Sequence, residues 1–333
     1  MAARGCAGSA HEEEEMTVYL STLVPGVARA ELDGAGWKET KVLPEVDVRV
    51  LASDPRDSDL VWAGTQGSGV LRSVDAGANW SQAGLEGRIV KALAASPGGR
   101  IYAGTNPAAV FVSEDDGGSW RELVGFRRVR QWFWFSPAER PFSAYVLGLA
   151  LDGETVIAGI EAGAVVRSTD GGETWLPHLP GSLRDCHSLA TALGRFYEAG
   201  GSGGGAARSI DGGLTWTRPE GHDRRYGWAS AADPVDPDLW YFSAAPGVRA
   251  HSENADAAIF RCRGDRALRV AGGSREPLRS MPYALITGPA PGHLVAGFAD
   301  GEVLESPDAG ESWQPLLRLP AISRTLIRVG CAT

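Results

Sequence analysis

The sequence predicts an all-β protein that is built from seven repeats, and three observations support this prediction. The skeleton Ser-x-Asp-x-Gly-x-x-Trp occurs five times, beginning at Ser73, Ser113, Ser168, Ser209 and Ser306. The starts are 40, 55, 41 and 97 residues apart, and the last interval is long enough for two repeats. The chain also contains 44 glycines, 20 prolines and 43% hydrophobic residues, which is typical of many short strands joined by tight turns.

Each skeleton is expected to form a tight turn between two strands. An Asp carboxylate in a turn commonly accepts hydrogen bonds from the backbone N–H groups of the same turn. In the first copy this residue is Asp75, Gly77 supplies a positive φ, and Trp80 begins the next strand as an anchor in the core. Because such a turn satisfies its own polar groups, we predict that these residues are structural.

Two weaker copies complete the count of seven. Residues 27–37 (VARAELDGAGW) keep Asp33, Gly36 and Trp37 of the skeleton, and residues 257–268 (AAIFRCRGDRAL) fill the long last interval. Upstream of the turns the repeats also agree, since an apolar strand, a turn that often reads Asp-Pro and a second strand follow one another, as in VRVLASDP and LVWAGT.

The skeleton resembles the Asp box of the sialidase-like (BNR repeat) β-propeller proteins, and this resemblance covers almost the whole chain. It implies a seven-bladed β-propeller with one box per blade, between the third and fourth strands, on the face opposite the binding funnel. Sialidases use an arginine triad for the substrate carboxylate, a tyrosine nucleophile assisted by a glutamate, and an aspartic acid. Their Phe/Tyr-Arg-Ile-Pro motif is absent, and the nearest match is Asp-Val-Arg-Val at residues 47–50.

The two ends of the repeat region are expected to meet. The first repeat starts at residues 17–22 (TVYLST) without an innermost strand, whereas residues 323–330 (SRTLIRVG) form an innermost-type strand with no box after it. We therefore predict that the last strand completes blade one and closes the ring, which removes exposed sheet edges. Residues 17–333 are then one propeller, and residues 1–16 are predicted to be a disordered tail.

Composition excludes several classes of partner. The net charge of −9 and the pI of about 5.3 argue against nucleic-acid binding, which usually needs a basic surface. The N-terminus has no apolar segment of a signal peptide, and no run approaches eighteen apolar residues, so a cytoplasmic protein without membrane contact is expected. The four cysteines have no paired spacing, and neither a disulfide framework nor a bound metal or cofactor is predicted.

The innermost strands suggest where a ligand binds. Aligned on their apolar cores, the seven strands place these residues at the channel entrance: Arg49, Lys91, Leu147, His187, Trp228, Tyr283 and Arg324. Arg49, Lys91 and Arg324, with Arg184 and Arg225 opposite, are candidates to bind a carboxylate or phosphate of a small anionic or sugar-like ligand. Alternatively, these cations pair with Asp47 and Asp185 and only fill a wet channel.

Four residues are candidates for catalysis. Asp185 is positioned to orient or charge His187, which would act as a general base, and Tyr226 and Tyr283 are nucleophile or acid candidates by analogy. His251 lies in the long loop of blade six and is predicted to reach the same funnel as a ligand-binding residue. A metal held by Asp185 and the two histidines is an alternative, but their spacing is not diagnostic.

One insertion bears on the class of function. Residues 125–145 lengthen the repeat between blades three and four and carry Trp132, Phe133, Trp134, Phe135 and Phe142. These rings either cap a pocket, pack as a small satellite core, or contact a protein partner. We favour a small-molecule site, with a glycosidase-like hydrolase or a lyase as the reaction class if the protein is an enzyme. The competing prediction is a non-catalytic scaffold for protein interaction or assembly.

Overall fold

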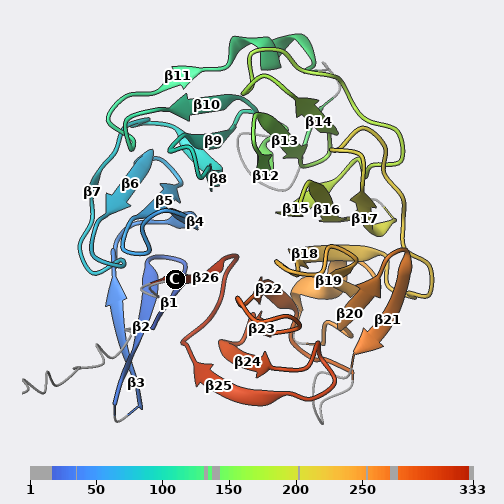
Figure 1. Cartoon of the computed structure of the whole chain (residues 1–333). Helices are drawn as coiled ribbons and strands as arrows, with labels where there is room; N and C mark the ends of the chain where they lie inside the picture. The colour runs from blue at the N-terminus through green and yellow to red at the C-terminus, as the bar shows by residue number, and fades with distance from the viewer. Residues whose placement is uncertain are drawn as a thin grey trace, which may run out of the picture.

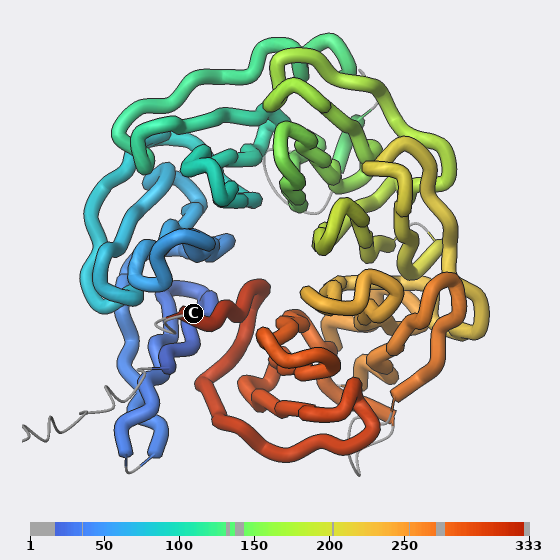
Figure 2. The backbone as a smooth tube through the Cα atoms, viewed as in Figure 1, coloured from blue at the N-terminus to red at the C-terminus, as the bar shows by residue number. Residues whose placement is uncertain are grey.

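The computed structural model describes residues 17–34, 36–130, 134–136, 143–201, 203–252, 254–270 and 277–329. Within them the chain forms seven antiparallel sheets arranged in a ring around a central channel (Figure 1). The backbone runs once around this ring, so each blade follows the preceding one in sequence (Figure 2). The fold is a seven-bladed β-propeller, as predicted. The predicted N-terminal tail, residues 1–16, lies outside the described residues.

The strands of each blade are given from the channel outward. Blade one contains β26 (Leu326–Val329), β1 (Val18–Thr22), β2 (Val27–Asp33) and β3 (Gly36–Val42). Blade two contains β4 (Val48–Ser53), β5 (Val61–Thr65), β6 (Val70–Ser73) and β7 (Ser81–Gln82). Blade three contains β8 (Ile89–Ala95), β9 (Ile101–Asn106), β10 (Val110–Ser113) and β11 (Arg121–Glu122).

Blades four and five have three strands each, and their fourth position is held by single bridges. Blade four contains β12 (Val146–Asp152), β13 (Thr155–Ile160) and β14 (Val165–Ser168), and blade five contains β15 (Cys186–Ala192), β16 (Arg195–Gly200) and β17 (Gly205–Ser209). The bridges join Arg167 to Leu176 and Arg208 to Thr217.

Blades six and seven again have four strands. Blade six contains β18 (Tyr226–Ala232), β19 (Leu239–Ala245), β20 (Ala258–Arg263) and β21 (Arg266–Val270), and blade seven contains β22 (Pro282–Thr287), β23 (Leu294–Phe298), β24 (Glu302–Ser306) and β25 (Gln314–Arg318). Two short 3-10 helices, η1 (Val124–Arg128) and η2 (Val248–His251), lie in the connections.

The five full skeletons form the expected turns between third and fourth strands. In the first, Ser73 Oγ donates to Asp75 Oδ1 at 2.7 Å and accepts the N–H of Gly77 at 2.9 Å. Asp75 Oδ1 also accepts the N–H of Asn79 at 2.8 Å, and Gly77 has a φ of 80°. The same pattern of Ser, Asp and Gly contacts recurs in the other four turns. These groups satisfy one another, which agrees with a structural role.

The hydrophobic core lies between the blades. Among the described residues it divides into seven clusters, and each cluster joins two neighbouring blades. Close approach of the blades explains the Ala-Gly-Thr ending of several second strands. A Cβ on Gly64 would lie 2.7 Å from Val90 of blade three, and one on Gly104 would lie 2.5 Å from Val146 of blade four. Only glycine leaves room there for the next innermost strand.

The C-terminal strand closes the ring as predicted, because β26 pairs with β1 in the sheet of blade one. Thr22, at the end of β1, strengthens this junction. Its Oγ1 accepts the backbone N–H groups of Arg324 and Thr325 at 3.1 and 2.9 Å, and its own N–H donates to the Thr325 carbonyl at 3.0 Å. Thr22 is completely buried, and its contacts with Arg324 and Thr325 are partly buried.

The first prediction concerns this junction. Thr22→Val keeps the shape of the side chain but leaves two backbone N–H groups without an acceptor, so the free energy of unfolding should fall by about 1–3 kcal/mol. Urea unfolding followed by circular dichroism measures this change. Thr40→Val on the exposed part of β3 is the matched control, since its hydroxyl makes only a long contact of 3.5 Å with the Arg29 carbonyl, and it should change stability much less. Equal stability of the Thr22 variant and the wild type would contradict the proposed role of the hydroxyl.

The second prediction concerns Glu198 on β16, which is completely buried and accepts only the N–H of Leu183, at 2.7 Å, among the described hydrogen bonds. Burial raises the pKa of Glu198 from its ordinary value of 4.5 to about 8. Because the unfolded chain loses this proton first, stability should fall as the pH rises from about 4.5 towards 8. Glu198→Gln should remove this loss.

Unfolding in urea at about pH 4, 6 and 8 tests the role of Glu198. The Glu198→Gln variant and the wild type should have similar stability at the lowest pH, where both side chains are neutral. The variant should be the more stable protein at the highest pH. A difference that does not change with pH would show that Glu198 does not titrate between these values.

Candidate functional site

A β-bulge lies at the entrance of six innermost strands and turns one side chain into the channel. The strand pairing skips one residue between Val48 and Val50 in blade two, and corresponding shifts occur in blades three to seven. The residues at these shifts are Arg49, Lys91, Leu147, His187, Trp228 and Tyr283. A bulge re-aims its side chain, so the fold itself repeats this arrangement around the ring.

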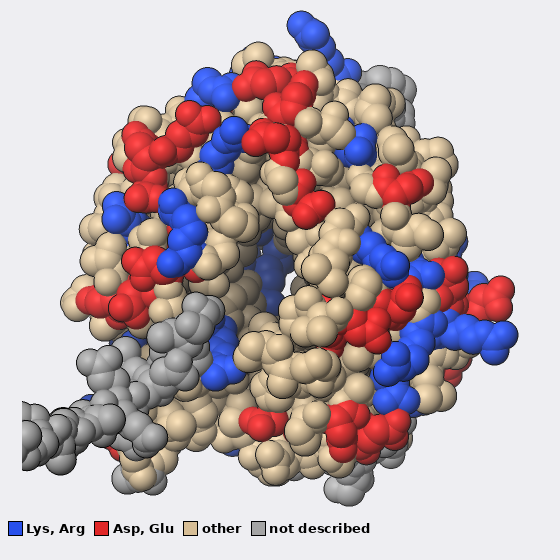
Figure 3. All heavy atoms as spheres, in the orientation of Figure 1, with Lys and Arg blue, Asp and Glu red and all other residues tan. Residues whose placement is uncertain are grey.

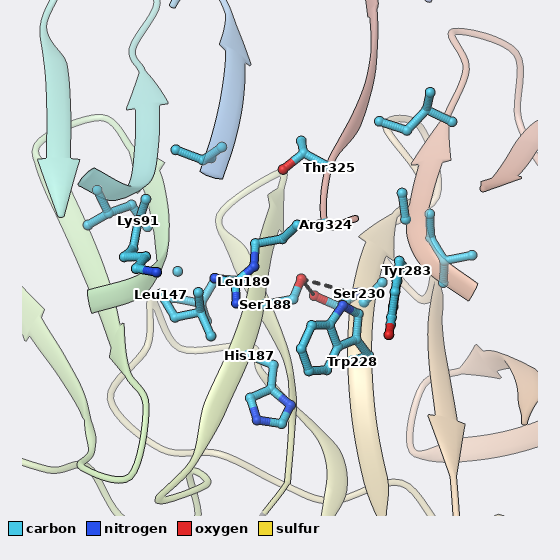
Figure 4. Close-up of a pocket in the computed structure, with 18 of the residues that line it drawn as sticks. Lys91, Leu147, His187, Ser188, Leu189, Trp228, Ser230, Tyr283, Arg324 and Thr325 are labelled. Atoms are coloured by element: carbon cyan, nitrogen blue, oxygen red, sulfur yellow. Dashed lines mark hydrogen bonds between the residues drawn. The ribbon is translucent and has the colours of Figure 1, made fainter. Parts of the chain in front are cut away.

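These side chains, except that of Arg49, line a cavity of about 200 Å³ in the channel. From the aligned set, the cavity is lined by Lys91, Leu147, His187, Trp228, Tyr283 and Arg324 (Figure 4). Leu93, Leu149, Leu189, Leu285 and Leu326 also line it. The channel is open in the space-filling view, where basic side-chain atoms are visible on its wall (Figure 3). The cavity therefore combines a polar and aromatic rim with apolar walls.

Two cations lie at this cavity. Lys91 is almost completely buried, and its Nζ lies 3.3 Å from Gln66 Oε1 and 5.4 Å from the ring centre of Tyr145. The guanidinium of Arg324 lies 5.9 Å from the ring of Trp228, and its Nη1 is buried without a hydrogen-bond partner among the described residues. Lys91 and Arg324 point into the same space in Figure 4. A buried guanidinium nitrogen is a strong hydrogen-bond donor for an anion.

The other three predicted cations lie elsewhere. Arg49 forms an ion pair with Asp47, at 2.5 Å between Nη2 and Oδ2, which is the pairing considered as the alternative to ligand binding. Arg184 and Arg225 are exposed in the loops before β15 and β18, and the cavity-lining residues among those described do not include them. The structure therefore brings together Lys91 and Arg324, but not five converging cations.

His187 and two carboxylates form a compact cluster beside the cavity. His187 has a side chain that is only 2% exposed, and its Nδ1 lies 2.7 Å from the carbonyl of Gly227. Since a carbonyl can only accept, Nδ1 carries the proton and Nε2 points the other way. Nε2 lies 3.6 Å from Asp185 Oδ1 and 3.8 Å from Glu161 Oε2. A ligand proton would have to reach Nε2 between these two carboxylates.

The cluster shifts the acidity of its members. Burial raises the pKa of Glu161, and the neighbouring charge of Asp185 adds to this effect. Burial would also raise the pKa of Asp185, but His187 and the N–H of Ala162, which donates to Oδ1 at 3.1 Å, lower it overall. For His187 burial lowers the pKa, yet Asp185, Glu161 and the Gly227 carbonyl outweigh burial and raise it. The cluster thus stabilises a positive charge at its centre.

An aromatic wall adjoins this cluster. The ring centres of His187 and Trp228 are 4.8 Å apart, and those of Trp228 and Tyr283 are 5.3 Å apart. His251 connects the hydroxyls of Tyr226 and Tyr283, at 3.1 Å from Nε2 and 2.7 Å from Nδ1. The pKa of His251 is lowered by burial and by the charges of His187 and Arg324, so it is a neutral bridge with one donor and one acceptor nitrogen. His251 therefore contacts Tyr226 and Tyr283 of this wall, but it is not among the described residues that line the cavity.

Sequence reasoning missed Glu161. It directly follows β13, the second strand of blade four, and the corresponding residues after β5 and at the end of β9 are Gln66 and Asn106. Gln66 contacts Lys91 of the next blade, and Glu161 contacts His187 of the next blade. A polar residue directly after the second strand of one blade can therefore indicate a contact with the bulge residue of the next blade. Glu161, Asp185 and His187 are the described residues that together could hold a metal ion.

The aromatic insertion is only partly described. Trp134 is buried and lies 6.4 Å from Phe126, whereas Phe135 is 54% exposed. Trp132, Phe133 and Phe142 lie outside the described residues. Trp134 therefore packs inward, but it belongs to the main cluster between blades three and four and does not form a separate satellite core.

Comparison with known proteins identifies the fold. The GH74 xyloglucanase from Xanthomonas campestris matches with a TM-score of 0.68 at 17% identity, over 90% of this chain and 52% of that one. The GH74 enzyme from Niastella koreensis matches with a TM-score of 0.64 at 16% identity, over 91% and 52%. YCF48 bound to D1 peptide matches with a TM-score of 0.57 at 14% identity, over 81% and 80%. These likenesses show the fold alone.

The comparisons do not assign the chain to a family. No protein-family model and no curated protein matches the chain. The chain spans about half the length of the two GH74 structures. Among the described residues, no helix combines the length and apolar character needed to cross a bilayer.

The third prediction concerns Gly201, which lies against the cluster. A Cβ at this position would collide with Asp185 Oδ2 and would lie 2.9 Å from Cε1 of His187 and 3.0 Å from Cε2 of Tyr226. Gly201→Ala should therefore lower the free energy of unfolding by about 1–3 kcal/mol, since overpacking displaces these groups. Urea unfolding measures the loss. Gly98→Ala, which would meet only Ser96 Oγ at 3.8 Å, should have little effect. Equal effects of the two substitutions would contradict the tight packing of the cluster.

Proposed function

We propose that the protein binds a small, sugar-like anion in the channel cavity. The observation that carries this proposal is Arg324, whose buried Nη1 has no hydrogen-bond partner among the described residues and whose side chain lines the cavity. Leaving such a donor buried and unpaired is costly, and a ligand carboxylate or phosphate would satisfy it. Lys91 lines the same cavity and adds a second positive charge.

The aromatic wall supports a sugar-like ligand. Trp228 presents a ring beside Arg324, and an aromatic face packs well against the apolar face of a sugar ring. Tyr283 lines the cavity and, with Tyr226 and His251, supplies polar groups that can hydrogen-bond to ligand hydroxyls. The cavity volume of about 200 Å³ suits a single sugar-sized molecule and not a long chain.

Catalysis is the narrower interpretation of the same site. We infer an Asp-box propeller of the sialidase-like kind, and a hydrolase or lyase activity would then use Asp185, His187, Tyr226 or Tyr283 beside the ligand. The GH74 enzymes, one of which is a xyloglucanase, support a hydrolase by analogy of fold only. Arg49, Arg184 and Arg225 would act on the approach of an anion and not in the cavity, because of their positions outside it.

A protein-binding scaffold is the second candidate. YCF48 bound to D1 peptide has the same fold, and Phe135 in the insertion is exposed. This interpretation has less support because Trp134 of the same insertion is buried, which leaves a smaller apolar surface for a partner. A location in the cytoplasm remains a prediction from the sequence.

The fourth prediction tests the anion site with two probes of similar shape, D-glucuronate and D-glucose, by isothermal titration calorimetry at low salt. The wild type should bind glucuronate more tightly than glucose. Arg324→Ala should weaken glucuronate binding about tenfold to a hundredfold, which is the effect of losing a hydrogen bond to a charged group. Binding of glucose should not change.

The control variant is Arg318→Ala, which removes an exposed arginine on β25 far from the innermost strands. It should bind both probes as the wild type does. Equal binding of glucuronate by the wild type and the Arg324 variant would overturn the proposal. A wild type that binds neither glucuronate nor glucose would also overturn the proposal.

A further inference from the structure

We propose that Glu161, Asp185 and His187 form a binding site for a divalent first-row metal ion, with Zn²⁺ or Mn²⁺ as its occupant. The site lies where blade four meets blade five, since Glu161 follows β13, Asp185 directly precedes β15, and His187 is the second residue of β15. The three candidate ligand atoms lie within 4.8 Å of one another. This inference does not depend on the sugar-like ligand, because it concerns residues other than Arg324 and Lys91.

The orientation of His187 is the first argument. A metal-binding histidine usually donates its second ring N–H to a carboxylate or a backbone carbonyl, which fixes the ring and the tautomer. Nδ1 of His187 makes this contact with the carbonyl of Gly227 at 2.7 Å. The ring is further fixed between Tyr226 and Trp228, at 5.1 and 4.8 Å between ring centres. Nε2 is therefore held in one direction, towards the two carboxylates.

The distances are the second argument. Nε2 lies 3.6 Å from Asp185 Oδ1 and 3.8 Å from Glu161 Oε2, and both separations exceed a normal hydrogen bond. Two ligands on one tetrahedral ion with bonds of about 2.1 Å lie about 3.4 Å apart. The two nitrogen–oxygen separations thus need to shorten by only a few tenths of an ångström. Their spacing fits a shared cation better than direct contact.

Charge and access complete the argument. Two carboxylates and one imidazole are a donor set that suits Zn²⁺ or Mn²⁺, whereas Ca²⁺ and Mg²⁺ favour oxygen ligands alone. Asp185 Oδ1 is also fixed by the N–H of Ala162 at 3.1 Å. The carboxylate side chains are 26% and 15% exposed, so solvent reaches both of them. Three protein ligands would leave at least one coordination position open.

The fifth prediction tests this site on the full-length, tag-free protein after treatment with EDTA. Titration calorimetry with ZnCl2, and electron paramagnetic resonance with MnCl2, should each show one bound ion per chain. Glu161→Gln keeps the shape of the side chain but removes its charge, and it should weaken binding of both ions by about a hundredfold or more. His187→Gln should have the same effect.

The matched control is His293→Gln. Its Nε2 lies 3.8 Å from Glu305 Oε1, the same separation as in the cluster, but no third ligand group joins this pair among the described residues. This variant should bind one ion as the wild type does. Thermal melts in EDTA show whether each variant is folded. Glu161→Gln carries the test if His187→Gln does not fold, because the Glu161 side chain is 15% exposed and that of His187 only 2%.

Two results would overturn the metal site. One is the absence of Zn²⁺ and Mn²⁺ binding by the wild type, and the other is unchanged binding of both ions by folded Glu161→Gln. A glucuronate titration in EDTA tests the anion site separately, because EDTA removes any bound metal ion. Binding of Mn²⁺ by Arg324→Ala with wild-type affinity would support two independent sites.

Discussion

The constraint on which this structure depends is that no blade contains a hydrophobic core of its own. Each of the seven apolar clusters in the described part of the chain lies between two blades, including the cluster that joins blade seven to blade one. That last cluster exists only because the chain ends meet. Pairing of β26 with β1 is therefore required to bury the seventh interface, in addition to covering a sheet edge.

Closure of the ring also positions Arg324 at the channel cavity. Arg324 lies two residues before β26, and its N–H and that of Thr325 are held by the hydroxyl of Thr22. This contact takes the place of the bulge found at the same position of the other six blades. The residue proposed to bind the ligand anion is thus positioned by the same hydrogen bonds that close the ring. Stability of the junction and geometry of the cavity are coupled through this short segment.

The sequence predicts the fold and the inner ring because both follow from repeated local rules. A strand alternates its side chains, so aligning seven strands on their cores predicts which residues face the channel, from Lys91 to Arg324. Loop residues follow no such rule, and Arg184 and Arg225 are exposed instead of facing the cavity. Glu161 could not be found from its own strand, since its role depends on His187 in the next blade. The burial of Trp134 likewise depends on packing against Phe126.

The side chains at the seven equivalent positions of the innermost strands differ in charge and shape from blade to blade, and this asymmetry argues for a specific ligand. Two of the cations are already engaged near the rim, since Arg49 pairs with Asp47 and Lys91 contacts Gln66. Blades five to seven instead contribute His187, Trp228 and Tyr283, whose rings form a continuous wall next to Arg324. A channel that was only filled would need no such segregation of aromatic, acidic and cationic groups. A ligand with one anionic end and one apolar face would contact Arg324 and Trp228 together, while its remaining polar groups faced the cluster of Glu161, Asp185 and His187.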